Sequence, residues 1–182
     1  MPSLRQVFFR LQKVSRHWRP ASLRTQRDKY IPAIQPDDNG DTHVALPSLN
    51  SLRILLIDDQ EEARESLTVV LTTSGANVFA AASAKEALAW LPTLTVGEMP
   101  DVLICDIAMP GEDGYAVLRK IRAWKTGSDF APLHRLPALA LTAFAQREDR
   151  IRALTAGFQM HVTKPVAPEE LIVVIATMVS RG

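Results

Sequence analysis

Five polar residues stand where short apolar runs of this sequence end. They are Asp58, Asp59, Asp106, Thr142 and Lys164. Short runs rich in apolar and β-branched residues, separated by helical patterns, are typical of buried parallel strands. The carboxyl ends of such strands share one edge of the sheet, and α/β proteins bind their ligands there. The spacing therefore predicts one crevice that contains three carboxylates, a hydroxyl and an ammonium group.

These groups indicate phosphoryl chemistry. Three carboxylates in one crevice repel each other unless a cation lies among them, and an all-oxygen site suits Mg²⁺. An ammonium group opposite that metal is suited to bind a phosphoryl group. A carboxylate can itself act as a nucleophile and form an aspartyl-phosphate. Taken singly, an Asp or Lys after a strand is usually a solvated loop residue, but five such residues at four strand ends favour a site.

The elements that position these residues alternate between strand and helix from residue 51 to residue 182. Strands are predicted at 52–57, 77–82, 101–105, 137–141 and 160–163. Helices are predicted at 61–74, after the Ser83 cap, at 115–124, at 147–155 and from Pro168 onward. This alternation predicts an α/β fold with a doubly wound, five-stranded parallel sheet in the flavodoxin-like order 2-1-3-4-5.

Residues 1–50 differ from the rest and are predicted to be a basic N-terminal extension with a linker. Residues 1–30 contain eight Lys and Arg against one Asp, a net charge of +7, whereas residues 51–182 contain 13 basic and 16 acidic side chains, a net charge of −3. Three prolines and a polar run at 37–41 indicate that residues 31–50 are linker.

Residues 3–19 predict an amphipathic helix. Its apolar stripe consists of Leu4, Val7, Phe8, Leu11, Val14 and Trp18. Such a helix can lie in an anionic membrane surface, bind an acidic partner or attract nucleic acid. An organellar targeting segment and a solvated basic tail are the alternatives. We favour contact with a membrane surface or an acidic partner.

At the five polar residues the sequence resembles the receiver domain of two-component response regulators. The resemblance covers residues 51–182 and keeps every motif in order. The motifs are Asp58-Asp59, Cys105-Asp106-Ile107-Ala108-Met109-Pro110-Gly111-Glu112-Asp113-Gly114, Leu141-Thr142-Ala143 and Lys164-Pro165. Residues 40–47 also resemble the last strand of a histidine-kinase ATPase domain, at the place where hybrid kinases join their receiver. Derivation from a hybrid kinase, or a receiver fragment of one, is therefore an alternative.

The resemblance implies that Asp106 is the phosphoacceptor. It also implies that Asp58, Asp59 and Asp106 hold Mg²⁺ together with the backbone carbonyl of Ala108. Gly114, at the end of the same motif, is expected to provide a backbone geometry that other residues resist.

Three further residues have roles that the resemblance implies. Lys164 would pair with Asp106 before phosphorylation and with a phosphoryl oxygen afterwards, and the Lys164–Pro165 peptide bond would be cis. Thr142 would donate its hydroxyl to the phosphoryl group. His161 stands where relatives usually have a Tyr or Phe that swings inward in the switch; a His can take this role and, unlike Tyr or Phe, can carry a charge near neutral pH.

The implied function is phosphorelay signal transduction. A sensor histidine kinase or a histidine phosphotransfer protein would supply the phosphoryl group. Phosphorylation would then switch the surface of the fourth helix, fifth strand and last helix for partner binding, with homodimerisation as one candidate outcome. Leu171, Val174, Ile175 and Met178 would face the sheet, which leaves Ile172, Val173 and Ala176 either as extra apolar surface or as part of a broader buried face.

Several alternatives compete with this interpretation. An aspartyl phosphatase would need a second Asp where Ala108 stands, so we expect self-catalysed phosphotransfer and slow autodephosphorylation rather than an enzyme acting on external substrates. No glycine-rich nucleotide motif follows the first strand. Only one helix is expected after Lys164, so we expect no DNA-binding domain there. A single cysteine and the lack of a long apolar stretch predict a cytoplasmic protein.

Overall fold

The computed structural model describes residues 34–36, 42–44, 46–124, 133–143 and 147–181 of the chain. Their main feature is a parallel sheet of β3 (Arg53–Ile57), β4 (Asn77–Ala81), β5 (Val102–Asp106), β6 (Ala138–Thr142) and β7 (Met160–Thr163). The strands pair in the order β4-β3-β5-β6-β7, which confirms the predicted order 2-1-3-4-5.

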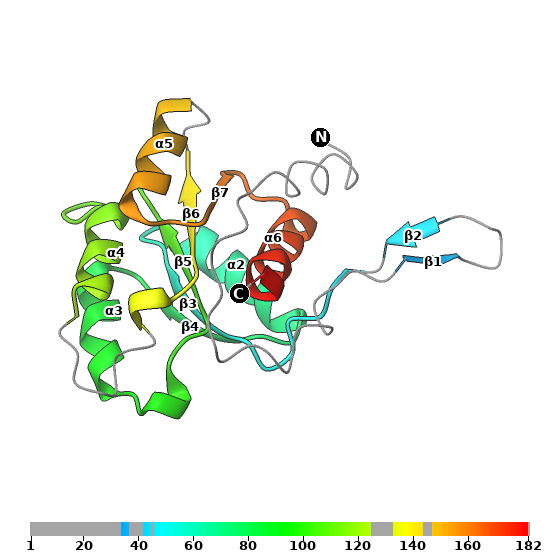
Figure 1. Cartoon of the computed structure of the whole chain (residues 1–182), viewed down its shortest axis with the longest axis horizontal. Helices are drawn as coiled ribbons and strands as arrows, with labels where there is room; N and C mark the ends of the chain where they lie inside the picture. Colours follow the sequence, from blue (N-terminus) through cyan, green and yellow to red (C-terminus); the bar gives the residue numbers. More distant parts are fainter. Residues whose placement is uncertain (1–33, 37–41, 45, 125–132, 144–146, 182) are drawn as a thin grey trace.

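Helices cover both faces of this sheet, as Figure 1 shows. One layer contains α2 (Glu61–Thr73) and α6 (Pro168–Arg181), and the other contains α3 (Ala84–Trp90), α4 (Gly114–Arg122) and α5 (Arg147–Ala156). Two short 3₁₀ turns, η3 (Leu91–Thr93) and η4 (Val96–Glu98), follow α3. Every residue of β5 and β6 is buried, because each of these strands lies between two neighbours and under helices on both faces.

Local capping explains where the helices begin. The Ser83 side chain accepts a hydrogen bond from the Glu86 N–H at 3.2 Å, and the Asp113 side chain accepts one from the Ala116 N–H at 2.7 Å. Each bond satisfies a backbone donor that has no partner within the first turn. The Glu86 carboxylate accepts from the Ala82 N–H at 2.7 Å. The predicted cap at Ser83 is therefore present.

The predicted linker contains an antiparallel pair of strands, β1 (Ile34–Pro36) and β2 (Thr42–Val44). These strands are three residues long, too short to show the alternation on which a sequence prediction depends. Leu49 is fully buried, and its N–H donates to the Ser74 carbonyl at 2.8 Å. The division of the chain at residue 50 stays a prediction.

The last helix differs from one of the two expectations. Ile172, Val173 and Ala176 are only 5%, 3% and 1% exposed, so they do not provide extra apolar surface. The structure instead shows the broader buried face. The predicted helix at 3–19 lies outside the described residues. Over the described part of the chain, no helix combines the length and apolar character needed to cross a membrane.

Candidate functional site

The five predicted polar residues lie at the carboxyl edge of the sheet. Asp106 and Thr142 are the last residues of β5 and β6. Asp58 and Asp59 follow β3 directly, and Lys164 follows β7. Carboxylate oxygens of Asp58, Asp59 and Asp106 lie within 4.8 Å of one another. The parallel topology thus brings together groups that are separated by up to about a hundred residues in the chain.

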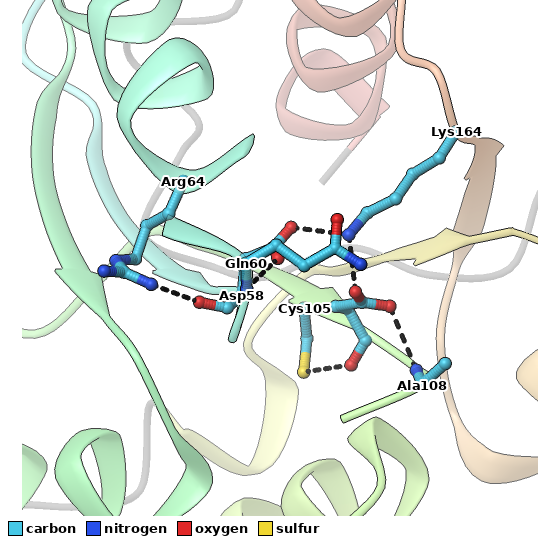
Figure 2. Close-up of polar contacts among 7 residues, drawn as sticks. Asp58, Gln60, Arg64, Cys105, Ala108 and Lys164 are labelled. Atoms are coloured by element: carbon cyan, nitrogen blue, oxygen red, sulfur yellow. Dashed lines mark hydrogen bonds and ion pairs between the residues drawn. The ribbon is translucent and has the colours of Figure 1, made fainter. Parts of the chain in front are cut away.

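Lys164 joins this cluster by ion pairs. Its Nζ atom lies 2.5 Å from Asp106 Oδ2 and 2.7 Å from Asp58 Oδ2 (Figure 2). Burial lowers the pKa of Lys164, but the hydrogen bonds to Asp106 and Asp58 raise it more, so the pKa lies above its usual range. Lys164 therefore stays protonated at neutral pH and balances part of the negative charge of the cluster.

The cluster is suited to a divalent cation. Asp58 and Asp106 are almost fully buried, at 0% and 2% exposed. Asp59 Oδ1 is also buried, and it accepts no hydrogen bond from the residues that the structure describes. A buried carboxylate oxygen without a donor is costly unless a cation or water satisfies it. Together, the carboxylates of Asp58, Asp59 and Asp106 provide the hard oxygen ligands that Mg²⁺ prefers.

Backbone contacts hold the carboxylates in place. The Gln60 N–H donates to Asp58 Oδ1 and the Ala108 N–H donates to Asp106 Oδ1, both at 3.0 Å. Arg64 Nη1 donates to the Asp58 carbonyl at 2.8 Å (Figure 2). Sequence reasoning missed Gln60 and Arg64, because a loop residue and a helix residue have no pattern that marks them as supports. These contacts leave Asp106 Oδ2 facing Lys164.

Gly114 has a different role from the one expected. Its φ is not positive; the positive φ in this loop, 80°, belongs to Gly111. Gly114 begins α4 so close to β5 that an added Cβ would lie 2.3 Å from the Asp106 carbonyl oxygen and 3.1 Å from Cys105 Sγ. The missing side chain, rather than special backbone geometry, is what this position requires, so that prediction was wrong in its reason.

Cys105 has a structural role beside the site. It is fully buried, and its Sγ lies 3.2 Å from the Asp106 carbonyl oxygen, to which the thiol can donate. Burial raises the pKa of the Cys105 thiol, and the carboxylates of Asp106 and Asp58 raise it further. A buried thiol held in its neutral form is chemically inert.

The two predicted switch residues, Thr142 and His161, lie on the neighbouring strands β6 and β7. Thr142 is 5% exposed, and its carbonyl accepts a hydrogen bond from the Lys164 N–H at 2.8 Å. His161 is half-buried in β7. The Lys164–Pro165 peptide bond is cis, which confirms that prediction. The roles of Thr142, His161 and the Ala108 carbonyl stay predictions.

Comparison with known proteins decides the family. A family profile described as the response regulator receiver domain matches residues 54–176. The chain belongs to the response regulator receiver family. Among solved structures, it is similar to the chemotaxis response regulator CheY4 of Vibrio cholerae, with 25% identity, a TM-score of 0.62, and coverage of 71% of this chain and 99% of that one. A receiver domain of a histidine kinase from Syntrophus aciditrophicus is 28% identical, with a TM-score of 0.57, and covers 72% of this chain and 89% of its own.

The chain is also similar to two curated proteins. A 14.6-kDa protein of Leptolyngbya boryana is 41% identical over 127 residues, which cover 70% of this chain and 89% of that protein. Response regulator MprA of Mycobacterium tuberculosis is 37% identical over 131 residues, which cover 72% of this chain and 52% of that protein. The chain thus spans about half the length of the MprA relatives it matches. Membership of the family indicates phosphorelay signalling in general; an origin in a hybrid kinase stays a prediction.

Proposed function

We propose that this receiver accepts a phosphoryl group on Asp106 from a sensor histidine kinase or a histidine phosphotransfer protein. The observation that supports this most directly is the ion pair of Lys164 with both Asp106 and Asp58 inside a buried acidic cluster. An ordinary surface salt bridge joins one basic and one acidic side chain and has no further carboxylates beside it. Here Asp59 adds a further carboxylate oxygen that accepts no hydrogen bond from the described residues.

The transfer needs one bond to form and one to break. Asp106 Oδ2 would attack phosphorus, while the bond from phosphorus to the donor's imidazole nitrogen breaks and the imidazole leaves with the electron pair. The Ala108 N–H fixes the other oxygen, Oδ1, so the carboxylate cannot rotate freely. Lys164, already 2.5 Å from Oδ2, would follow the charge from the carboxylate to a phosphoryl oxygen.

The acidic residues have the second role in the proposal. Asp58, Asp59 and Asp106 would hold Mg²⁺, with the Ala108 carbonyl as a further ligand. When bound, Mg²⁺ offsets the negative charge of the transferring group. Thr142 would then donate its hydroxyl to the phosphoryl group, and the face formed by α5, β7 and α6 would change its affinity for partners. His161 in β7 is the proposed switch residue between these two events.

We do not propose turnover of an external substrate. The side chain of Ala108, two residues after Asp106, has no group that can act as a general acid. Loss of the phosphoryl group from Asp106 would therefore be slow and intrinsic.

Phosphorylation of the full chain with a small phosphodonor and Mg²⁺ tests the proposal. One acid-stable, base-labile phosphoryl group should appear, measured by intact mass. Asp106→Asn should abolish it. Asp113→Asn is the matched control, because it removes the same charge from the same loop and Asn still caps α4. Labelling of Asp106→Asn at the rate of the unmodified protein would refute the assignment.

A further inference from the structure

Two cations hold Asp58 from its two ends. Lys164 Nζ lies 2.7 Å from the carboxylate oxygen Oδ2, and Arg64 Nη1 donates to the main-chain carbonyl at 2.8 Å. Figure 2 shows Arg64 and Lys164 on opposite sides of Asp58. The contact with Lys164 belongs to the phosphoacceptor site. The contact with Arg64 lies outside that site, although the carbonyl that it binds is bonded directly to the nitrogen of Asp59.

The Asp58 carbonyl is part of the peptide unit that joins Asp58 to Asp59. Strand β3 ends at Ile57, so this peptide lies beyond the ladder that pairs β3 with β4 and β5. A peptide unit is planar and rigid, and a donor that fixes its oxygen also fixes the direction in which the next residue leaves it. Arg64 therefore restrains the backbone from which the Asp59 side chain reaches the acidic cluster.

Asp59 depends on this restraint more than the other two carboxylates do. Asp58 Oδ1 and Asp106 Oδ1 each accept a backbone N–H hydrogen bond at 3.0 Å. Asp59 Oδ1 is buried and accepts no hydrogen bond from the residues that the structure describes. Because this oxygen has no such donor, the place of the carboxylate depends on the backbone that carries it, and Arg64 is what restrains that backbone.

The position of Arg64 is unfavourable for helix α2 itself. The helix begins at Glu61, so Arg64 is its fourth residue. Side chains of a helix lean toward its N-terminus, and the guanidinium group of Arg64 accordingly reaches back past the first turn. The positive end of the helix dipole lies there and disfavours a cation, although Glu61 and Glu62 in the same turn offset part of this effect. The bond to the Asp58 carbonyl, rather than the stability of the helix, accounts for an Arg at this position.

We propose that Arg64 is a positioning residue for the metal site. By fixing the peptide between Asp58 and Asp59, it holds the Asp59 carboxylate where the acidic cluster binds Mg²⁺ most tightly. The inference rests on the proposed function, because it requires that this cluster takes a divalent cation. Groups that orient metal ligands without touching the metal contribute about 10- to 100-fold in metal affinity, so an effect of that size is expected here.

The sign of the effect separates positioning from simple electrostatics. Removing a positive charge near three carboxylates should tighten the binding of a divalent cation, whereas losing a positioning contact should weaken it. Arg64→Met removes both the charge and the donor but keeps a flexible apolar stem. Arg64→Lys keeps the charge and a donor group.

Urea denaturation of the full chain at a series of Mg²⁺ concentrations measures two quantities. The free energy of unfolding without Mg²⁺ reports the stability of the fold, and its rise with Mg²⁺ gives the Kd of the folded chain. We expect Arg64→Met to raise the Kd about 10- to 100-fold, and Arg64→Lys to recover part of this loss. Arg119→Met is the matched control, because Arg119 is exposed on α4, and it should leave the Kd unchanged.

Two outcomes would overturn the inference. A Kd for Arg64→Met equal to or below that of the unmodified chain would show that Arg64 only supports the fold, even if this variant is less stable without Mg²⁺. An equal rise in Kd for Arg119→Met would show that the effect does not come from the Asp58 carbonyl.

Phosphorylation of Asp106 by a small donor is measured on the same proteins. The rate for Arg64→Met should fall at low Mg²⁺ and recover as Mg²⁺ saturates the site, because the variant lacks affinity rather than the phosphoacceptor. A chain that binds Mg²⁺ and is phosphorylated equally well with and without Arg64 contradicts this inference alone. Failure of the unmodified chain to bind Mg²⁺ would overturn the proposed metal site together with it.

Discussion

Replacing Gly114 by Ala tests whether the contact between α4 and the end of β5 positions the phosphoacceptor. The new Cβ would lie 2.3 Å from the Asp106 carbonyl oxygen, well inside the 3.0 Å that real Cβ atoms essentially never cross. The atom it meets is backbone, so no side chain can rotate away, and either α4 or β5 must move. Overpacking of this kind costs about 1–3 kcal/mol.

A smaller effect opposes this cost. Ala restricts the unfolded chain more than Gly does, which stabilises a protein by about 0.4–1 kcal/mol. The net result for Gly114→Ala is a loss of roughly 0 to 2.6 kcal/mol in the free energy of unfolding, with a middle value of about 1.3 kcal/mol. Gly97→Ala is the matched control, because a Cβ at Gly97 meets no atom within 4 Å and only the stabilising effect remains.

Urea denaturation measures the stability of both variants, and phosphorylation by a small donor measures the site. A displacement of about 1 Å at a reacting group can cost about a hundredfold in rate, so Gly114→Ala should also be phosphorylated more slowly while Gly97→Ala is not. Equal stability and equal phosphorylation rates for the two variants would show that α4 does not restrain Asp106 in this way.

Two further predictions concern the same site. At a Mg²⁺ concentration ten times the Kd, the free energy of unfolding of the full chain should rise by about 1.4 kcal/mol. Asp59→Asn should lose most of this gain, whereas the control Asp113→Asn should keep it. An equal gain in all three proteins would contradict the metal assignment. Burial raises the pKa of the Cys105 thiol, whereas an unfolded thiol titrates near about pH 8.5. Below about pH 8.5 the thiol is neutral in both the folded and the unfolded chain, so its deprotonation does not favour unfolding. Above that pH only the unfolded chain loses the proton, and the free energy of unfolding should fall by about 1.4 kcal/mol per pH unit. Cys105→Ala should flatten this slope in urea midpoints between about pH 8 and about pH 10, and an unchanged slope would refute the linkage.

The strands and their order were predictable because their signals are local and strong. Each apolar run ends at a polar residue, and the helical patterns between the runs require parallel strands. The predicted and observed ends of the strands differ by about one residue. The strand predicted at 101–105 is β5 at Val102–Asp106, because the backbone of Asp106 still pairs with β6 in register with Leu141. A side chain that ends an apolar run can thus belong to the strand itself.

The gathering of the acidic residues with Lys164 was predictable from topology alone, but the contacts within the site were not. Parallel strands place Asp58, Asp106 and Lys164 at one edge whatever their side chains do. That Lys164 pairs with both carboxylates depends on distances of 2.5 and 2.7 Å, which spacing in the sequence does not determine. The same holds for Arg64, whose bond to the Asp58 carbonyl crosses from a helix to a loop.

The last helix, α6, shows the limit of periodicity as evidence. Apolar residues at 171–176 are equally consistent with one buried stripe beside an apolar surface and with burial on two sides. A helical pattern records which residues are apolar, whereas burial depends on what the rest of the chain brings to each face. The structure shows burial of both sets of positions, and all of them belong to one apolar cluster with residues of α2 and the sheet.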